Sequence, residues 1–207
     1  MKVILFGATG LAGSALLKHL LQAGFEVTAF VRTPSKIKEE HAALQILEGD
    51  VLQGESVAAA IEGQDAVVSA ISEGPTIVHH TQSKGVANII KAMKQKGVQR
   101  IVAMGSVGIL QRNVEQLVRD VGYPAAYYPI SEEQYNVFQQ LQRSSLQWTQ
   151  VCPPMIVDKD GDGAYETKKN YAIKGRQEVY AGNIGLFVAK ELRENNYLQT
   201  RVAIANA

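Results

Sequence analysis

The chain has 207 residues, 21 of them basic and 20 acidic, with a formal net charge of +1 and 46% hydrophobic residues. This length predicts one α/β domain over residues 1–207, and the balanced charge argues against nucleic-acid or anionic-membrane partners. The single cysteine, Cys152, excludes an internal disulfide. We find no membrane-length apolar run and no signal-peptide pattern, so we expect a cytoplasmic protein. Separately, we expect a monomer.

The first 31 residues predict a strand, a glycine turn, a helix and a second strand. Apolar runs at 3–6 and 27–31 flank the turn at residues 7–13 and an amphipathic stretch at 16–23. Gly7 allows a tight turn, Gly10 lets a pyrophosphate approach the backbone, and Gly13 lets the helix pack closely. The helix N-terminus offers N–H groups to phosphate. The spacing GxxGxxG departs from the dehydrogenase GxGxxG, and the alternative is a turn that binds nothing.

Arg32 ends the second strand, where many NAD-binding folds place an acidic residue that binds the ribose 2′-hydroxyl. Residues 33–36 contain no acid and include Lys36. A guanidinium can bind phosphate bidentately, so this pattern favours a 2′-phosphate and therefore NADPH over NADH. The alternative is that Arg32 and Lys36 are solvated loop charges.

The remaining chain continues to alternate between strands and helices. We expect strands at 44–47, 66–70, 100–104 and 147–152, and helices at 54–61, 79–96 and 131–143. This alternation predicts a doubly wound parallel sheet of the Rossmann type.

Ligands of such sheets bind at the carboxyl ends of the strands. We therefore expect cofactor contacts from Gly7, Thr9, Gly10, Leu11, Arg32, Lys36, Asp50, Val51, Ala70, Ile71, Pro153 and Met155. Asp50 can accept a hydrogen bond from an adenine amino group while Val51 packs on the ring. The alternative for Asp50 is a turn cap.

Several segments together carry a family resemblance: GATGLAG, VRTPSK, EGDVLQ, QDAVVSAIS, VAMGS, LQRSSLQWTQVCPPMI and IKGRQEVYAGNIGLFVAKEL. The chain resembles the atypical short-chain dehydrogenase/reductase group. Within it, the chain is most similar to the NADPH-dependent flavin reductase/biliverdin-IXβ reductase family. The resemblance implies one domain, bound NADPH and hydride transfer to flavins or linear tetrapyrroles.

The same resemblance assigns Ser106 as the active-site serine beside the nicotinamide; the alternative is a turn-capping serine. Met155 stands where the family has a histidine. Because a thioether cannot donate a proton, this departure disfavours strict bilin activity more than flavin reduction.

Typical short-chain dehydrogenases use a Tyr-x-x-x-Lys pair, and Ile130 and Gln134 stand at the positions we align with it. Reduction of ketones, which needs that proton relay, is therefore disfavoured, whereas a conjugated flavin or bilin takes hydride directly. A non-catalytic NADP(H) sensor that regulates a partner is the alternative from another functional class. A nucleotide-sugar epimerase or dehydratase is a weaker third reading.

Four further features carry less weight. We expect the calcium-like run at 158–163 to be a surface turn, and neighbouring His79 and His80 not to bind metal, so we predict no metal site. The polar and aromatic side chains of segment 108–129 either line an acceptor pocket or anchor a surface loop: Gln111, Arg112, Tyr123, Tyr127 and Tyr128. For Cys152 we favour inert packing over reactivity.

Overall fold

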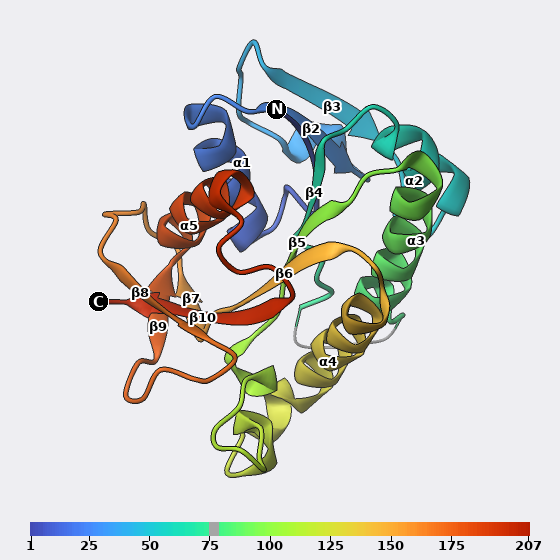
Figure 1. The fold of residues 1–207 in the computed structure, drawn as a ribbon. Coiled ribbons are helices and arrows are strands. Elements are labelled where there is room, and N and C mark those ends of the chain that lie inside the picture. Colours follow the sequence, from blue (N-terminus) through green and yellow to red (C-terminus); the bar gives the residue numbers. More distant parts are fainter. Residues whose placement is uncertain (75–78) are drawn as a thin grey trace.

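A computed structural model describes residues 1–74 and 79–207. Within these residues the main sheet has eight strands (Figure 1). Their spatial order is β3 (Leu44–Glu48), β2 (Glu26–Val31), β1 (Lys2–Phe6), β4 (Ala66–Ser69), β5 (Arg100–Met104), β6 (Gln147–Cys152), β10 (Thr200–Asn206) and β8 (Tyr165–Lys169). Neighbouring strands run parallel except β8, which pairs antiparallel with β10.

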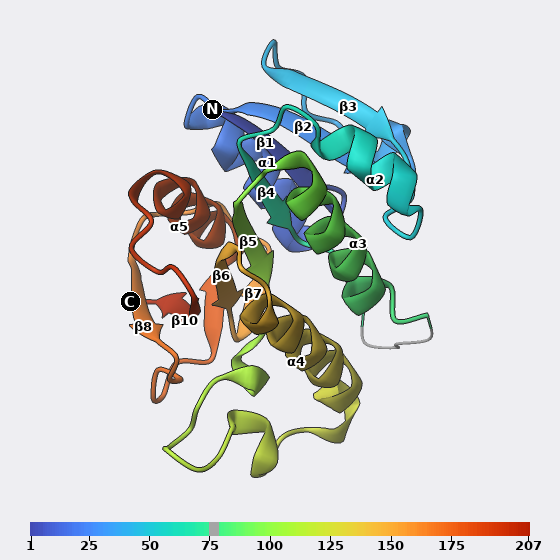
Figure 2. The same cartoon turned by 45° about the vertical axis from the view of Figure 1, so that its right-hand side comes forward.

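Helices cover both faces of this sheet (Figures 1 and 2). One face carries α1 (Leu11–Gln22) and α5 (Ala181–Glu194), and the other carries α2 (Gly54–Ile61), α3 (Thr81–Lys96) and α4 (Tyr128–Arg143). Short 3₁₀ turns are η1 (Pro34–Lys36), η2 (Val107–Ile109), η3 (Val118–Asp120) and η4 (Ala125–Tyr127). A separate parallel pair joins β7 (Met155–Val157) to β9 (Glu178–Tyr180).

Strand β1 shows why both faces are covered. Successive side chains of a strand point to opposite faces. Val3 and Leu5 accordingly belong to the core beneath α1 and α5, while Ile4 and Phe6 belong to the core beneath the other three helices. A continuous apolar run suits a parallel strand that is buried on both sides.

The predicted doubly wound sheet is thus confirmed, but three helices begin at other residues than expected and four strands are additional. Helix α1 begins at Leu11 rather than 16, because the helix starts directly from the glycine turn. Helix α3 begins at Thr81 rather than 79, and α4 at Tyr128 rather than 131. The antiparallel strand β8, strand β10 and the pair β7–β9 were not predicted. No helix among the described residues is long and apolar enough to cross a bilayer.

Candidate cofactor site

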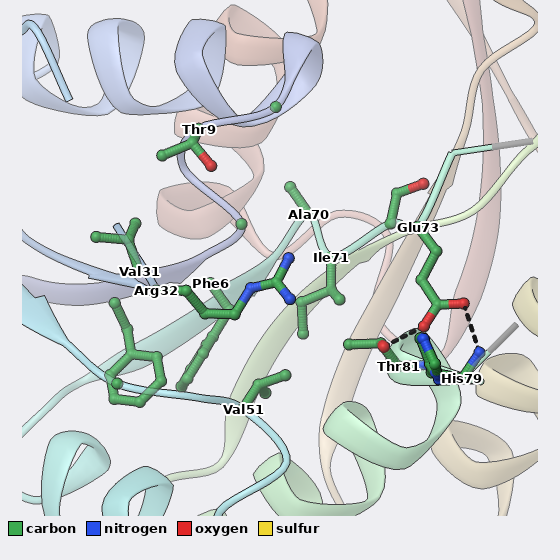
Figure 3. Close-up of a pocket in the computed structure, with 15 residues that line it drawn as sticks. Phe6, Thr9, Val31, Arg32, Val51, Ala70, Ile71, Glu73, His79 and Thr81 are labelled. Atoms are coloured by element: carbon green, nitrogen blue, oxygen red, sulfur yellow. Dashed lines mark hydrogen bonds between the residues drawn. The ribbon is translucent and has the colours of Figure 1, made fainter. Parts of the chain in front are cut away.

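The register of the sheet brings the carboxyl ends of three strands together. Phe6 at the end of β1 lies opposite Phe30 of β2 and Ser69 of β4. A cavity of about 410 Å³ opens at these ends (Figure 3). It is lined by Phe6, Gly7, Thr9, Gly10, Phe30, Val31, Arg32, Gly49, Val51, Ala70, Ile71, Ser72, Glu73, His79 and Thr81.

The glycines of the turn meet different surroundings. Gly7 has φ +84°, and a Cβ there would lie 2.5 Å from the Ala70 carbonyl oxygen, so the turn is tight against the end of β4. A Cβ on Gly13 would collide with the Gly7 carbonyl oxygen, so helix α1 packs on the turn itself. At Gly10 the nearest atom would be the Gly7 oxygen at 3.7 Å, which leaves this position open for a ligand.

The start of α1 offers backbone donors to an anion. Gly10 is its N-cap residue, and no side chain of the described residues caps this end of the helix. The first N–H groups of a helix lack intrahelical acceptors and carry partial positive charge. Together with the open position at Gly10, this arrangement fits the pyrophosphate of a dinucleotide.

Arg32 directly follows β2 and reaches across the cavity. Figure 3 shows its guanidinium directed toward Ala70 and Ile71, which follow β4. Its side chain is exposed, so the charge faces solvent and any ligand in the cavity rather than the core. A guanidinium in this place can bind a phosphate on the ribose.

Apolar side chains form the floor of the cavity. Val51 packs against Gly85 of α3: a Cβ added to Gly85 would lie only 2.9 Å from the Cγ1 atom of Val51. The Phe30 ring lies 5.1 Å from that of Phe6, centroid to centroid. This floor suits a flat heteroaromatic ring.

Glu73 and Thr81 form an edge of the cavity that sequence reasoning missed. The Glu73 carboxylate accepts hydrogen bonds from the backbone N–H groups of Thr81, at 2.8 Å, and His79, at 3.2 Å, and from the Thr81 hydroxyl (Figure 3). These bonds tie the segment after β4 to the start of α3. Glu73 lies four residues after β4 and Thr81 begins α3, so no spacing in the sequence pairs them.

The structure brings seven of the twelve expected cofactor residues to the cavity wall: Gly7, Thr9, Gly10, Arg32, Val51, Ala70 and Ile71. Five lie outside that wall: Leu11, Lys36, Asp50, Pro153 and Met155. The Asp50 carboxylate accepts a hydrogen bond from the backbone N–H of Leu52 at 2.9 Å, as the turn-cap alternative predicts. The side chain of Lys36 is exposed on η1.

Pro153 and Met155 follow β6, beyond β5 from the cavity. Pro153 is buried and its carbonyl accepts the Val107 N–H at 2.8 Å, whereas Met155 is 64% exposed in β7. Met155 therefore presents an accessible thioether at this side of the sheet.

Ser106 follows β5 and also lies outside the cavity wall. Its Oγ is buried and has no hydrogen bond of good geometry among the described residues. The hydroxyl lies near that of Tyr123: burial raises the Tyr123 pKa, and the Ser106 hydroxyl opposes that rise. Ser106 makes no side-chain cap to η2, so the turn-capping alternative is wrong.

The polar and aromatic side chains of segment 108–129 lie in different surroundings, and none of them lines the cofactor cavity. Tyr127 and Tyr128 are 54% and 46% exposed, and the Arg119 guanidinium lies over the Tyr128 ring. Tyr123 is half-buried beside Ser106. Gln111 lines a different cavity, under α4.

The run at 158–163 is a surface loop, as expected. Asp160 pairs with Lys18 at 2.6 Å, and Asp162 accepts a hydrogen bond from the Asn183 amide. His80 pairs with Glu133 at 2.7 Å. Among the described residues, no three His, Cys, Asp or Glu side chains gather as metal ligands would.

Cys152 is fully buried at the end of β6, and burial raises its pKa to about 12. The thiolate is the reactive form of cysteine, so we expect the native protein to resist a thiol reagent such as DTNB near pH 8. The reaction should become rapid and stoichiometric once denaturant unfolds the chain. Fast labelling of the native protein at this single cysteine would contradict this interpretation.

Two sequence relatives place these features in context. A Bacillus subtilis (strain 168) protein named uncharacterized protein YwnB is 30% identical over 214 residues, covering 100% of this chain and 99% of its own. An NAD(P)H azoreductase of Xenophilus azovorans is 29% identical over 152 residues. That match covers 73% of this chain but 47% of the azoreductase.

Two solved structures share the fold. A Bacteroides thetaiotaomicron protein provisionally named an epimerase has a TM-score of 0.89 at 29% identity, covering 99% of this chain and 96% of its own. A Streptococcus pneumoniae TIGR4 protein provisionally named an NADH-flavin reductase has a TM-score of 0.87 at 23% identity, with 100% of both chains covered. A family model described as NAD(P)H-binding matches residues 7–195. The chain therefore belongs to the NAD(P)H-binding family.

Proposed function

We propose that this protein is an NADPH-dependent reductase that passes hydride to a planar conjugated acceptor. The expected acceptors are flavins (FMN, FAD or riboflavin), with biliverdin as a further candidate. The observation that carries the choice of cofactor is the Arg32 guanidinium, which reaches into the same cavity as the glycine turn. No acidic residue follows it in 33–36 to bind a 2′-hydroxyl instead.

The residues of the cavity have separate tasks in this proposal. Backbone N–H groups at the start of α1 hold the pyrophosphate, and Arg32 holds the 2′-phosphate. Val51 and Ile71 would pack against the adenine, where their apolar surfaces would exclude water. Ser106, which follows β5 beside β4, is the residue that would orient the nicotinamide.

NADPH, when bound, supplies the hydride. The chain lacks the Tyr-x-x-x-Lys pair, because Ile130 and Gln134 stand in its place in α4. Ketone reduction needs a side chain with a tuned pKa to deliver a proton to the alkoxide, and that pair is missing here. Reduction of a flavin needs chiefly stacking, orientation and a dry environment. The relative named NAD(P)H azoreductase supports nicotinamide-dependent reduction, though it matches over part of its length.

Steady-state NADPH oxidation in the presence of each acceptor tests the proposal. We expect turnover with at least one flavin and a lower KM for NADPH than for NADH. Tight NADP(H) binding without turnover on FMN, FAD, riboflavin or biliverdin would instead favour a non-catalytic sensor that regulates a partner.

Ser106→Ala tests the proposed chemistry. A hydroxyl that only orients the nicotinamide or the acceptor contributes roughly 1–3 kcal/mol, so we expect kcat to fall about 10- to 100-fold. Because burial raises the pKa of both Tyr123 and Cys152, neither group should produce a bell in the kcat profile between about pH 6 and 9. The acceptor's own ionisation is measured separately and subtracted. Loss of about four decades would identify Ser106 as an obligatory proton relay and contradict the mechanism.

A further inference from the structure

A second cavity, of about 500 Å³, lies between α4, the starts of β6 and β10, and the segment after η2. We call it the Arg201 groove. Its walls include Gln111, Phe138, Gln142, Trp148, Tyr171 and Arg201. It shares no lining residue with the cofactor cavity among the described residues, and its volume is typical of a small-molecule site.

Arg201 is the unusual member of this groove. It is only 7% exposed, and none of the carboxylates in the described part of the chain pairs with it. One guanidinium nitrogen donates to the Ile109 carbonyl, while the buried Nε–H has no acceptor among the described residues. A buried charge is costly unless it is paired, so a cation in this situation favours an anion in the adjoining space.

The Phe138 ring defines which side of the guanidinium is available. The guanidinium carbon lies 4.3 Å from the ring centroid, so the ring covers one face of the cation. The N–H groups of a guanidinium point outward in its plane, where a carboxylate binds with two parallel hydrogen bonds. Stacking on Phe138 therefore leaves to an anion those N–H groups that do not donate to the Ile109 carbonyl.

The other walls indicate the shape of the ligand. Phe138, Trp148 and Tyr171 bring three aromatic rings to one small cavity. Aromatic rings pack favourably against other flat rings. The buried Gln111 Oε1 has no donor among the residues described, and so offers an acceptor to a ring N–H or O–H.

We propose that the Arg201 groove binds a small planar aromatic carboxylate, with its carboxylate on Arg201 and its ring against the aromatic walls. This site is separate from the cofactor cavity and does not depend on the reductase assignment. It is the kind of site that would hold a metabolite acid or a regulatory ligand of that chemistry.

Trp148 makes this proposal directly measurable, because it is the only tryptophan of the chain and it lines the groove. The full chain is titrated with benzoate at constant ionic strength while Trp148 fluorescence is followed. Benzamide, the neutral analogue, serves as the matched probe. We expect saturation by benzoate with a dissociation constant on the order of 1 mM, and binding of benzamide at least about tenfold weaker.

Variants assign the response to the groove. Arg201→Gln should abolish benzoate binding, whereas Arg112→Gln, the same change at an exposed arginine nearby, should leave it unaltered. Gln142→Glu keeps Arg201 and its bond to Ile109 but adds a carboxylate at the exposed rim, and should weaken benzoate at least about tenfold. If Arg201→Gln does not fold, Gln142→Glu tests whether benzoate binds at Arg201.

Three results would overturn the proposal. They are the absence of a saturable response to benzoate, an equal response to benzamide, and unchanged affinity in folded Arg201→Gln or in Gln142→Glu. None of these measurements requires NADPH. The benzoate proposal can therefore succeed or fail independently of the reductase proposal.

Discussion

Replacing Gly10 with valine should abolish cofactor binding while leaving the fold intact. Gly10 has φ −86° and ψ 171°, a conformation that valine adopts readily, and its Cβ would meet only the Gly7 oxygen at 3.7 Å. The added branches instead occupy the space into which the pyrophosphate must come. We expect the dissociation constant for NADPH to rise by at least about 100-fold, measured by calorimetry or by the fluorescence of bound NADPH.

Gly13→Val provides the matched control. Its Cβ would collide with the Gly7 carbonyl, so we expect a loss of thermal stability rather than a selective loss of binding. Gly10→Ala should fall between wild type and valine in affinity. Normal NADPH binding by a folded Gly10→Val protein would show that the phosphates do not lie at this turn.

Replacing Arg32 with alanine should weaken NADPH binding and change NADH binding little. A charge-assisted hydrogen bond contributes about 1.5–3 kcal/mol, which corresponds to roughly 10- to 150-fold in the dissociation constant. NADH lacks the 2′-phosphate, so it has little to lose at this position.

Arg32→Lys should give an intermediate loss, because it keeps the charge but not the bidentate fork. Lys38→Ala, at an exposed lysine whose amino group donates to the Ser35 carbonyl, controls for a general loss of positive charge. Equal losses for NADPH and NADH in Arg32→Ala would mean that Arg32 does not read the 2′-phosphate.

The first half of the fold follows from local signals. The glycine spacing, the apolar runs of β1 and β2, and the turn between them are encoded in adjacent residues, so they could be predicted. Strand β8 could not, because its sequence YETKK is polar and charged, and it pairs only at the sheet edge. β7 and β9 are three residues each and become strands only because the chain brings them together.

Some residues of the candidate site could also be predicted from the sequence, and others could not. Residues that directly follow β1, β2 and β4 reach the cavity because parallel strands end at one edge. Asp50 also follows a strand, but its carboxylate turns back to the Leu52 N–H. Glu73 and Thr81 join the site through hydrogen bonds between a loop and a helix start, which no spacing in the sequence announces.

Direct hydride transfer from NADPH to a flavin on this chain is the reaction that the proposed function requires. Anaerobic single turnover, with protein and NADPH in excess over FMN, measures it by the loss of flavin absorbance. We expect one FMN to be reduced for each NADPH oxidised, and a slower rate when deuterium replaces the transferred hydrogen. Stable NADPH binding with no more flavin reduction than in the absence of protein would contradict the account and favour an NADP(H) sensor.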